Sequence, residues 1–141
     1  MKATQYMEKS LLIKDLCARL PYGVQVQDTR CGISGKLHDM LVFPLYKGND
    51  VYDYVATTNF YTDCYYDDIE YFKPYLLPLS SMTEEQKEEY HNNCNVGLNR
   101  CGNEIYFDSI ESIDWLNKNH FDYRNLIEKG LAIDATNLNI Y

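Results

Sequence analysis

Residues 37–57 read LHDMLVFPLYKGNDVYDYVAT, and this stretch sets the fold class. Two runs rich in β-branched and aromatic residues, 37–46 and 51–57, flank KGND at 47–50, which has the composition of a hairpin turn. Pro44 cannot donate a hydrogen bond to a strand ladder, so we expect its strand to lie at a sheet edge or to contain a bulge. The stretch therefore predicts an antiparallel β-hairpin.

The segments on both sides of this hairpin predict more strands and one long helix. Residues 22–27 alternate in polarity, and 69–75 form a further strand pattern. These runs predict a small antiparallel sheet, with a partly open SH3-like barrel as an alternative arrangement of the same strands. Residues 4–20 predict a helix that Pro21 stops, with Thr4 as a candidate N-cap. Because this helix is apolar on two sides, we expect it between the sheet and later helices.

The second half of the chain predicts mainly helices. Thr83-Glu84-Glu85-Gln86 is a capping-box pattern that starts a helix through about 92. Residues 92–103 are rich in Asn and Gly, which predicts a loop. A short strand at 103–107, a helix that either Asp108 or Ser109 opens and that runs to about 119, and a short helix at 122–130 with Asp122 as N-cap and Gly130 at its end complete the pattern. The chain 1–141 is thus predicted to form a single α+β domain, with a small antiparallel sheet packed by an N-terminal helix and C-terminal helices.

Net charge is −8 and unevenly distributed, which bears on the kind of partner. Residues 1–47 carry a net charge of +3, 48–72 carry −6 and 73–141 carry −5. Nucleic-acid binding normally rests on Lys and Arg that neutralise phosphates, so a nucleic-acid partner is not expected. The sequence contains no cofactor-binding motif, and we expect no cofactor.

The termini and the cysteines indicate the compartment. The first 20 residues carry charges among their apolar positions and lack the apolar core of a secretory signal. No run approaches the roughly 20 apolar residues that span a bilayer, so no membrane contact is expected. The five cysteines are an odd number without regular spacing. We therefore expect reduced thiols in a cytosolic protein.

The densest feature of the sequence is an acidic, tyrosine-rich stretch at 46–75, which holds eight Tyr and six Asp or Glu residues. Tyrosine offers a large rigid contact area and keeps a hydroxyl for polar contact, as at many protein interfaces. The alternative interpretation is that the rings only cover a half-exposed sheet face. The candidate partner-binding residues are Tyr52, Tyr54, Tyr61, Asp63, Tyr65, Tyr66, Asp67 and Asp68. Trp115 is the second candidate, because it lies off the apolar stripe of its predicted helix.

Metal binding and catalysis have little support in the sequence. His91, Cys94 and Cys101 form the one metal-like spacing, but a structural zinc site needs four ligands. They are a weak candidate, and no metal is predicted. Cys94 lies three residues after His91, yet no third group or oxyanion donor can be named beside them. No catalytic residue is therefore predicted.

Three segments carry a resemblance: LLIKDLCARLPYGV at 11–24, IEYFKPYLLPLSSMTEEQKEEY at 69–90 and SIDWLNKNHFDYRNLIEKGLAID at 112–134. They resemble a group of uncharacterised small proteins of phages and mobile elements from anaerobic gut bacteria. The resemblance implies a mobile-element origin and a cytoplasmic location in a bacterial host cell. It implies no activity, substrate or site residue.

The functional hypothesis is a non-enzymatic phage or mobile-element accessory protein that acts by protein–protein contact through the acidic Tyr-rich face. One alternative is a small-ligand binder or enzyme whose site is assembled from scattered His, Cys and carboxylate residues. A second is a DNA-mimicking inhibitor. The partner's identity and the oligomeric state, including a homo-oligomer, stay open at this point.

Overall fold

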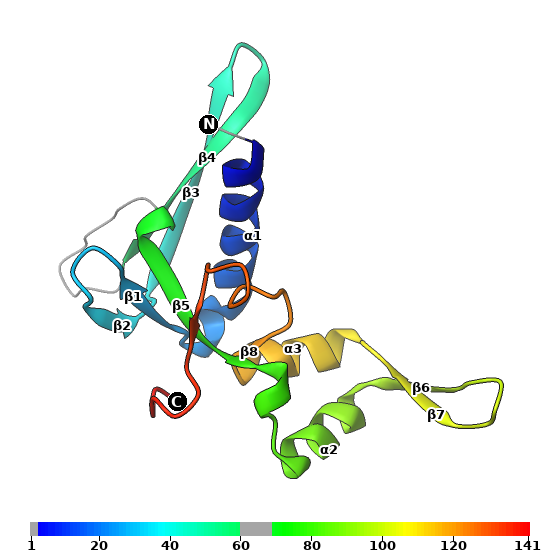
Figure 1. The fold of residues 1–141 in the computed structure, drawn as a ribbon. Coiled ribbons are helices and arrows are strands. Elements are labelled where there is room, and N and C mark those ends of the chain that lie inside the picture. The colour runs from blue at the N-terminus through cyan, green and yellow to red at the C-terminus, as the bar shows by residue number, and fades with distance from the viewer. Residues whose placement is uncertain (1–2, 60–68) are drawn as a thin grey trace.

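The computed structural model describes residues 3–59 and 69–141, with side chains described at 7–40, 48–49 and 69–141. Within these ranges the chain is an α+β fold, as the sequence predicts, with α1 at Ala3–Arg19 running beside a small sheet (Figure 1). A short 3-10 turn at Leu20–Tyr22 contains Pro21 and ends α1. Thr4 lies inside the helix, so its predicted N-cap role is wrong.

The main sheet has the order β2-β1-β5-β8, with β9 also paired to β5. Its strands are β1 (Gln25–Asp28), β2 (Ser34–Lys36), β5 (Phe72–Pro78), β8 (Phe121–Asp122) and β9 (Ile133–Asp134). β1 pairs antiparallel with β2 and β5, whereas β5 pairs parallel with β8 and β9. The expected antiparallel sheet is therefore a mixed one, because the chain returns through a helix before it adds its last two strands.

The predicted hairpin is present as β3 (Asp39–Lys47) and β4 (Asp50–Asn59). Pro44 faces Tyr54 in the register, and the ladder shifts between Leu45 and Tyr46, next to the proline. Among the described residues β3 and β4 pair only with each other, and the ladders do not close into a barrel. The hairpin extends beyond the main sheet near the start of α1 (Figure 1).

The helices of the second half begin where their caps predict. α2 (Glu84–Asn93) starts after Thr83 and α3 (Ile110–Lys118) after Ser109, each with both hydrogen bonds of a capping box. Between them lie β6 (Asn95–Leu98) and β7 (Glu104–Phe107), which form a separate two-stranded ladder. β7 was predicted, but β6 lies inside the predicted loop, so that part of the loop prediction is wrong.

The predicted helix at 122–130 is absent and a single turn takes its place. Asp122 still acts as a cap, because its carboxylate accepts from the backbone N–H groups of Leu126 and Ile127, both at 2.9 Å. Its backbone is held in β8, and Leu131 N–H returns to the Leu126 carbonyl to close the turn at 2.8 Å. This segment therefore follows the edge of the sheet.

The core lies between α1 and the main sheet. Its buried side chains come from α1, β1, β5 and the turn after β8, and the largest fully buried ones include Phe72, Leu16 and Leu126. Burial of such side chains is the main favourable term in folding. Within the described ranges, no helix is both long and apolar enough to cross a membrane.

Candidate protein-binding arm

Residues 84–107, which comprise α2, β6 and β7, form an arm that extends away from the main sheet (Figure 1). The β6–β7 ladder runs from Asn95 opposite Phe107 to Leu98 opposite Glu104. No further strand among the described residues joins it. Because an isolated two-stranded hairpin is marginally stable in water, the arm depends on its side-chain contacts.

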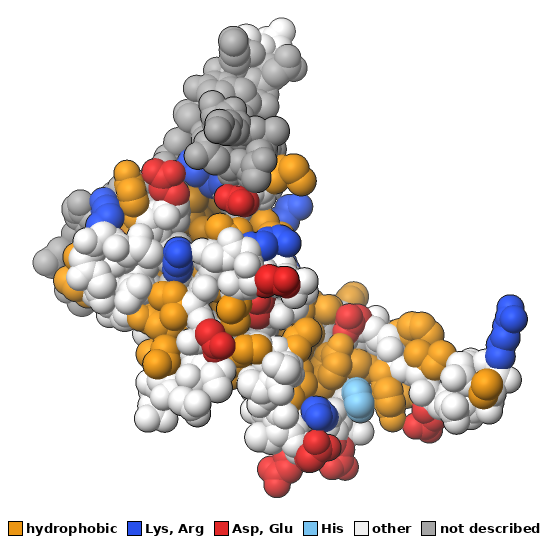
Figure 2. Space-filling model, in the orientation of Figure 1, with side chains coloured by type: hydrophobic (Ala, Val, Ile, Leu, Met, Phe, Trp, Pro, Cys, Tyr) orange, Lys and Arg blue, Asp and Glu red, His pale blue; other side chains and the backbone are white. Residues whose placement is uncertain are grey.

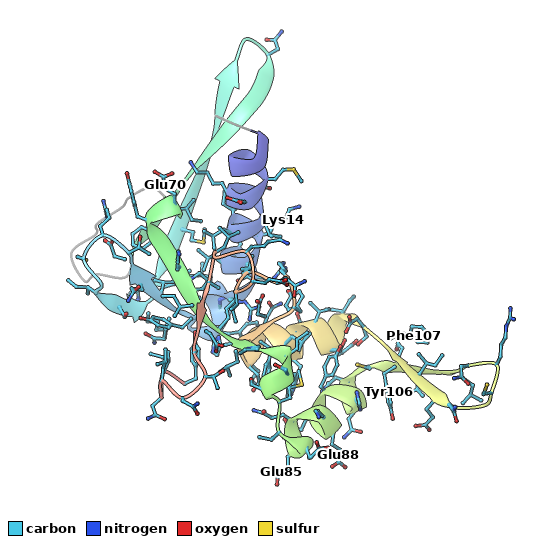
Figure 3. The ribbon with its side chains drawn as sticks, viewed as in Figure 1. Lys14, Glu70, Glu85, Glu88, Tyr106 and Phe107 are labelled. Atoms are coloured by element: carbon cyan, nitrogen blue, oxygen red, sulfur yellow. The ribbon has the colours of Figure 1, made fainter. Side chains whose placement is uncertain are left out.

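Side chains of α2 hold one face of the hairpin. The His91 imidazole stacks on the Tyr106 ring, with centroids 3.9 Å apart and planes 4° apart. The Tyr106 hydroxyl donates to the Glu104 carboxylate at 3.0 Å. The pKa of Tyr106 is raised, mainly by this hydrogen bond. Figure 3 shows Tyr106 and Phe107 on opposite sides of the hairpin, with Tyr106 on the side of α2. α2 therefore orients the hairpin through ring stacking.

The base of the arm is fixed by hydrogen bonds that join α2 to the start of α3. Ser109 Oγ donates to the Asn93 carbonyl at 2.5 Å. The Tyr90 hydroxyl donates to the Asp108 carboxylate. Burial raises the Tyr90 pKa, and the hydrogen bond to Asp108 raises it further, so the hydroxyl keeps its proton and remains a donor. The two ends of the hairpin are thus tied together.

The hairpin exposes large apolar side chains on both faces. Val96 is 56% exposed, Leu98 71% and Tyr106 40% on one face, and Phe107 is 52% exposed on the other. Ile110, at the start of α3, is 79% exposed. Figure 2 shows apolar side chains exposed along the arm. A two-stranded ribbon with exposed apolar groups on both faces is typical of an interaction site.

Acidic groups surround this apolar surface. Residues 84–114 contain eight Asp or Glu and two Lys or Arg, a net charge of −6 out of −8 for the chain. An open groove of about 740 Å³ runs between α2 and the hairpin, with Glu84, Glu85 and Glu88 among its lining residues. Figure 2 shows red side chains around the N-terminal half of α2, where Figure 3 labels Glu85 and Glu88. The arm therefore offers an apolar ribbon with an acidic rim.

Trp115, the second candidate from the sequence, is half-buried at the base of the arm. Its ring stacks on Phe121, with centroids 5.6 Å apart and planes 9° apart. Its Nε1 donates to Glu89 of α2 at 3.3 Å, and the Tyr90 ring lies 5.9 Å from it. Trp115 therefore joins the arm to the core through these contacts.

The tyrosine- and aspartate-rich candidates cannot be placed in this way. Tyr52 and Tyr54 lie in β4, but their side chains are outside the described ones. The rest of the set lies outside the described residues: Tyr61, Asp63, Tyr65, Tyr66, Asp67 and Asp68. Their role as a binding face stays a prediction.

The weak metal candidate does not assemble. Cys94 ends α2, whereas Cys101 lies in the loop beyond β6, and His91 is stacked on Tyr106. No group of three or more His, Cys, Asp or Glu residues in the described part of the chain could hold a metal ion. The three residues therefore do not form a zinc site in this structure.

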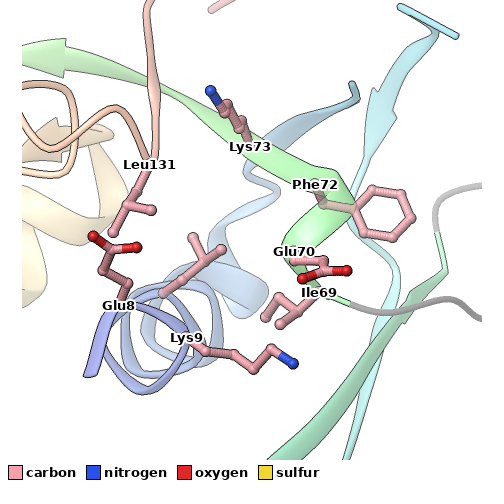
Figure 4. Close-up of a pocket in the computed structure, with 8 residues that line it drawn as sticks. Glu8, Lys9, Ile69, Glu70, Phe72, Lys73 and Leu131 are labelled. Atoms are coloured by element: carbon pink, nitrogen blue, oxygen red, sulfur yellow. The ribbon is translucent and has the colours of Figure 1, made fainter. Parts of the chain in front are cut away.

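A separate, more enclosed hollow lies between α1 and β5 (Figure 4). Its volume is about 180 Å³, and its lining includes Glu8, Lys9, Lys73 and Leu131. Pockets for drug-sized ligands usually measure roughly 300–1,000 Å³. Among its lining residues in the described part of the chain there are carboxylates, such as Glu8 and Glu70, but no histidine or cysteine to combine with them as the scattered-residue hypothesis requires.

Sequence reasoning overlooked the arm as a site, because the Asn-rich composition of 92–103 indicated only a loop. A signal was present, since Val96 and Leu98 alternate with small or polar residues, as strand residues do. Comparison of the chain with protein-family models, curated proteins and solved structures finds no match.

Proposed function

We propose that the protein is a non-enzymatic binding protein that acts by protein–protein contact through the arm. The observation that carries this proposal is the exposed apolar ribbon of β6 and β7 inside a segment of net charge −6. Apolar area supplies affinity, whereas the carboxylates select a basic partner surface and speed the encounter. An accessory role in a phage or mobile element remains part of the proposal, supported by the resemblance of three segments.

The test is capture of a partner from native bacterial lysate with matched variants. Leu98→Glu places a charge on the ribbon, and Met7→Glu places one at a similarly exposed position on α1, since the two side chains are 71% and 69% exposed. We expect wild type and Met7→Glu to retain the same protein, and Leu98→Glu to lose it. Retention by all three proteins would contradict the arm as the binding surface.

A DNA-mimicking inhibitor is the second candidate, favoured by the carboxylates on both sides of the hairpin, which include Glu85, Glu88, Glu111 and Asp114. Such an inhibitor binds mainly through charge. Its complex should therefore dissociate at about 1 M salt, where the Debye length is only about 3 Å and the charges of the two partners are largely screened from each other. It should also tolerate Leu98→Glu. Persistence of the complex at high salt, with sensitivity to Leu98→Glu, favours the apolar contact.

A small-ligand or enzyme role rests on the groove beside α2, where His91 lies among Glu84, Glu85 and Glu88. The groove is open, and the imidazole is stacked on Tyr106. A thermal-shift screen with metabolites tests this candidate. A shift that His91→Ala abolishes would favour a small ligand over a protein partner.

A further inference from the structure

We propose that the arm binds its partner by strand addition, with β6 (Asn95–Leu98) pairing along its free edge with an extended segment of the partner. This inference rests on the proposed function and specifies how the arm makes contact. The occupant is an extended peptide segment in which apolar residues alternate with Lys or Arg. Main-chain pairing supplies affinity in this mode, and alternate side chains supply specificity.

The register of the hairpin identifies the backbone groups that point outward. Asn99 N–H donates to the Asn103 carbonyl at 2.9 Å, which makes these two residues a hydrogen-bonded pair at the end of the ladder. In an antiparallel ladder such pairs alternate with non-hydrogen-bonded ones. Val96 and Leu98 therefore fall at non-hydrogen-bonded positions, and their N–H and C=O groups point away from β7.

These groups on β6 are open to a new strand. Within the described part of the chain, no backbone or side-chain hydrogen bond reaches the main-chain atoms of Val96 or Leu98 outside their own ladder. Proteins usually protect a free edge with charge, proline or a bulge, and Asn95-Val96-Gly97-Leu98 has none of these. The opposite edge, on β7, carries Glu104. β6 is therefore the edge that accepts a strand.

The surroundings define the chemistry of that strand. Residues of an added strand opposite Val96 and Leu98 would lie on the same face as these side chains, where an apolar residue would cover them. Neighbouring positions would point to the opposite face of the ribbon, where Asp108, Glu111 and Asp114 lie beside Asn95. A second copy of the chain is a poor occupant, because two copies of segment 84–114, each with a net charge of −6, would repel each other.

The experiment uses the whole protein and two synthetic peptides of alternating Lys and Val. One peptide has a normal backbone, and the other carries N-methyl groups on alternate amides, so that it cannot donate along one edge. We expect the normal peptide to bind and to protect the Val96 and Leu98 amides from hydrogen exchange, measured by NMR. The methylated peptide should bind at least about tenfold more weakly, the equivalent of roughly one lost main-chain hydrogen bond.

A matched pair of variants tests the edge from the protein side. Val96→Pro removes an outward donor that the β6–β7 ladder does not use, whereas Val96→Thr keeps the donor and the branched shape. Val96→Pro should bind the normal peptide about tenfold more weakly than Val96→Thr. If the proline disturbs the hairpin, the two peptides still test the same edge on the wild-type protein.

Three outcomes would overturn strand addition: equal binding of the two peptides, no binding of either peptide, or exchange protection elsewhere than β6. These failures are distinct from a failure of the proposed function. A lysate partner lost by Leu98→Glu but held equally by Val96→Pro and Val96→Thr would leave the arm as the binding surface and reject only strand addition. Peptide-independent self-association through the arm would identify a second copy as the occupant and reject the basic segment.

Discussion

Arg19 donates from Nε to the Asp15 carboxylate at 2.9 Å, one helical turn earlier in α1, and both side chains are fully buried. Arg19 also donates to the Phe121 carbonyl at 2.6 Å, and Arg124 donates to the other Asp15 oxygen at 2.8 Å. This cluster joins α1 to the segment that follows α3. Asp15 and Arg19 are both 0% exposed, so the pair is fully removed from solvent.

Replacing Asp15 by Asn should destabilise the protein strongly. The change leaves the buried Arg19 without its ion-pair partner, and breaking a buried pair costs about 3–5 kcal/mol. Glu84→Gln is the matched control, because the Glu84–Lys87 pair at 3.2 Å is exposed and should contribute less than about 1 kcal/mol. Urea unfolding followed by circular dichroism measures both. If both variants lost a similar amount of stability, burial of the Asp15–Arg19 pair would not explain its contribution.

Stability should fall as the pH decreases from 6.5 toward 4, in part because of His120. Burial, and secondly the charge of Arg19, lower the pKa of His120 from 6.5 to about 4. In this pH window His120 is therefore protonated in the unfolded chain but not in the folded protein. As the pH falls, the free energy of unfolding should decrease by at most about 1.4 kcal/mol per pH unit from this group. Urea midpoints measured across the window test this slope.

His120→Asn should flatten this part of the pH dependence. Asn tolerates the left-handed backbone at this position, where φ is +63°, although the stack of His120 on Tyr141 is lost. His38→Asn serves as the control, because that side chain is exposed. A slope that survives His120→Asn unchanged would show that other groups produce it.

Truncating Trp115 should loosen the arm as well as destabilise the fold. Trp115→Ala removes the stack on Phe121 and should cost about 3 kcal/mol. Trp115→Phe keeps an aromatic ring at this position but loses the hydrogen bond to Glu89, which should lower the free energy of unfolding by about 1 kcal/mol. Hydrogen exchange in α2 should rise more in the Ala variant. Unchanged exchange in both would mean that the arm is held by Tyr90 and Ser109 alone.

Gly97→Ala should disturb the arm without unfolding the protein. A Cβ at Gly97 would lie 2.9 Å from Cε2 of Phe107, so the half-exposed ring must swing aside. We expect a stability change within about 1 kcal/mol, the span of strand preferences. NMR shifts should change at β6 and β7 only. Gly102→Ala, in the loop at φ +80°, is the contrasting variant, because its cost comes from the backbone.

Local signals in the sequence predicted much of the fold. Pro21 ends α1, Thr83 and Ser109 start their helices, and the KGND turn at 47–50 joins β3 to β4, as the residue types predict. The prediction at 122–130 was wrong although its signals were good. Asp122 and Gly130 were expected to bound a helix, but they bound a turn instead, because pairing of β8 with β5 holds the backbone out of a helix.

The α+β class, the end of α1, the starts of α2 and α3, and the acidity follow from the amino-acid sequence, because these depend on neighbouring residues or on composition. The tertiary structure was needed to establish that Asp15 and Arg19 form a buried pair, that Trp115 joins the arm to the core, and that no other strand in the described part of the chain pairs with the outer edge of β6. Each of these depends on contacts or exposure set by segments far apart in the chain. Local periodicity carries no information about such neighbours, and only the packed fold brings them together.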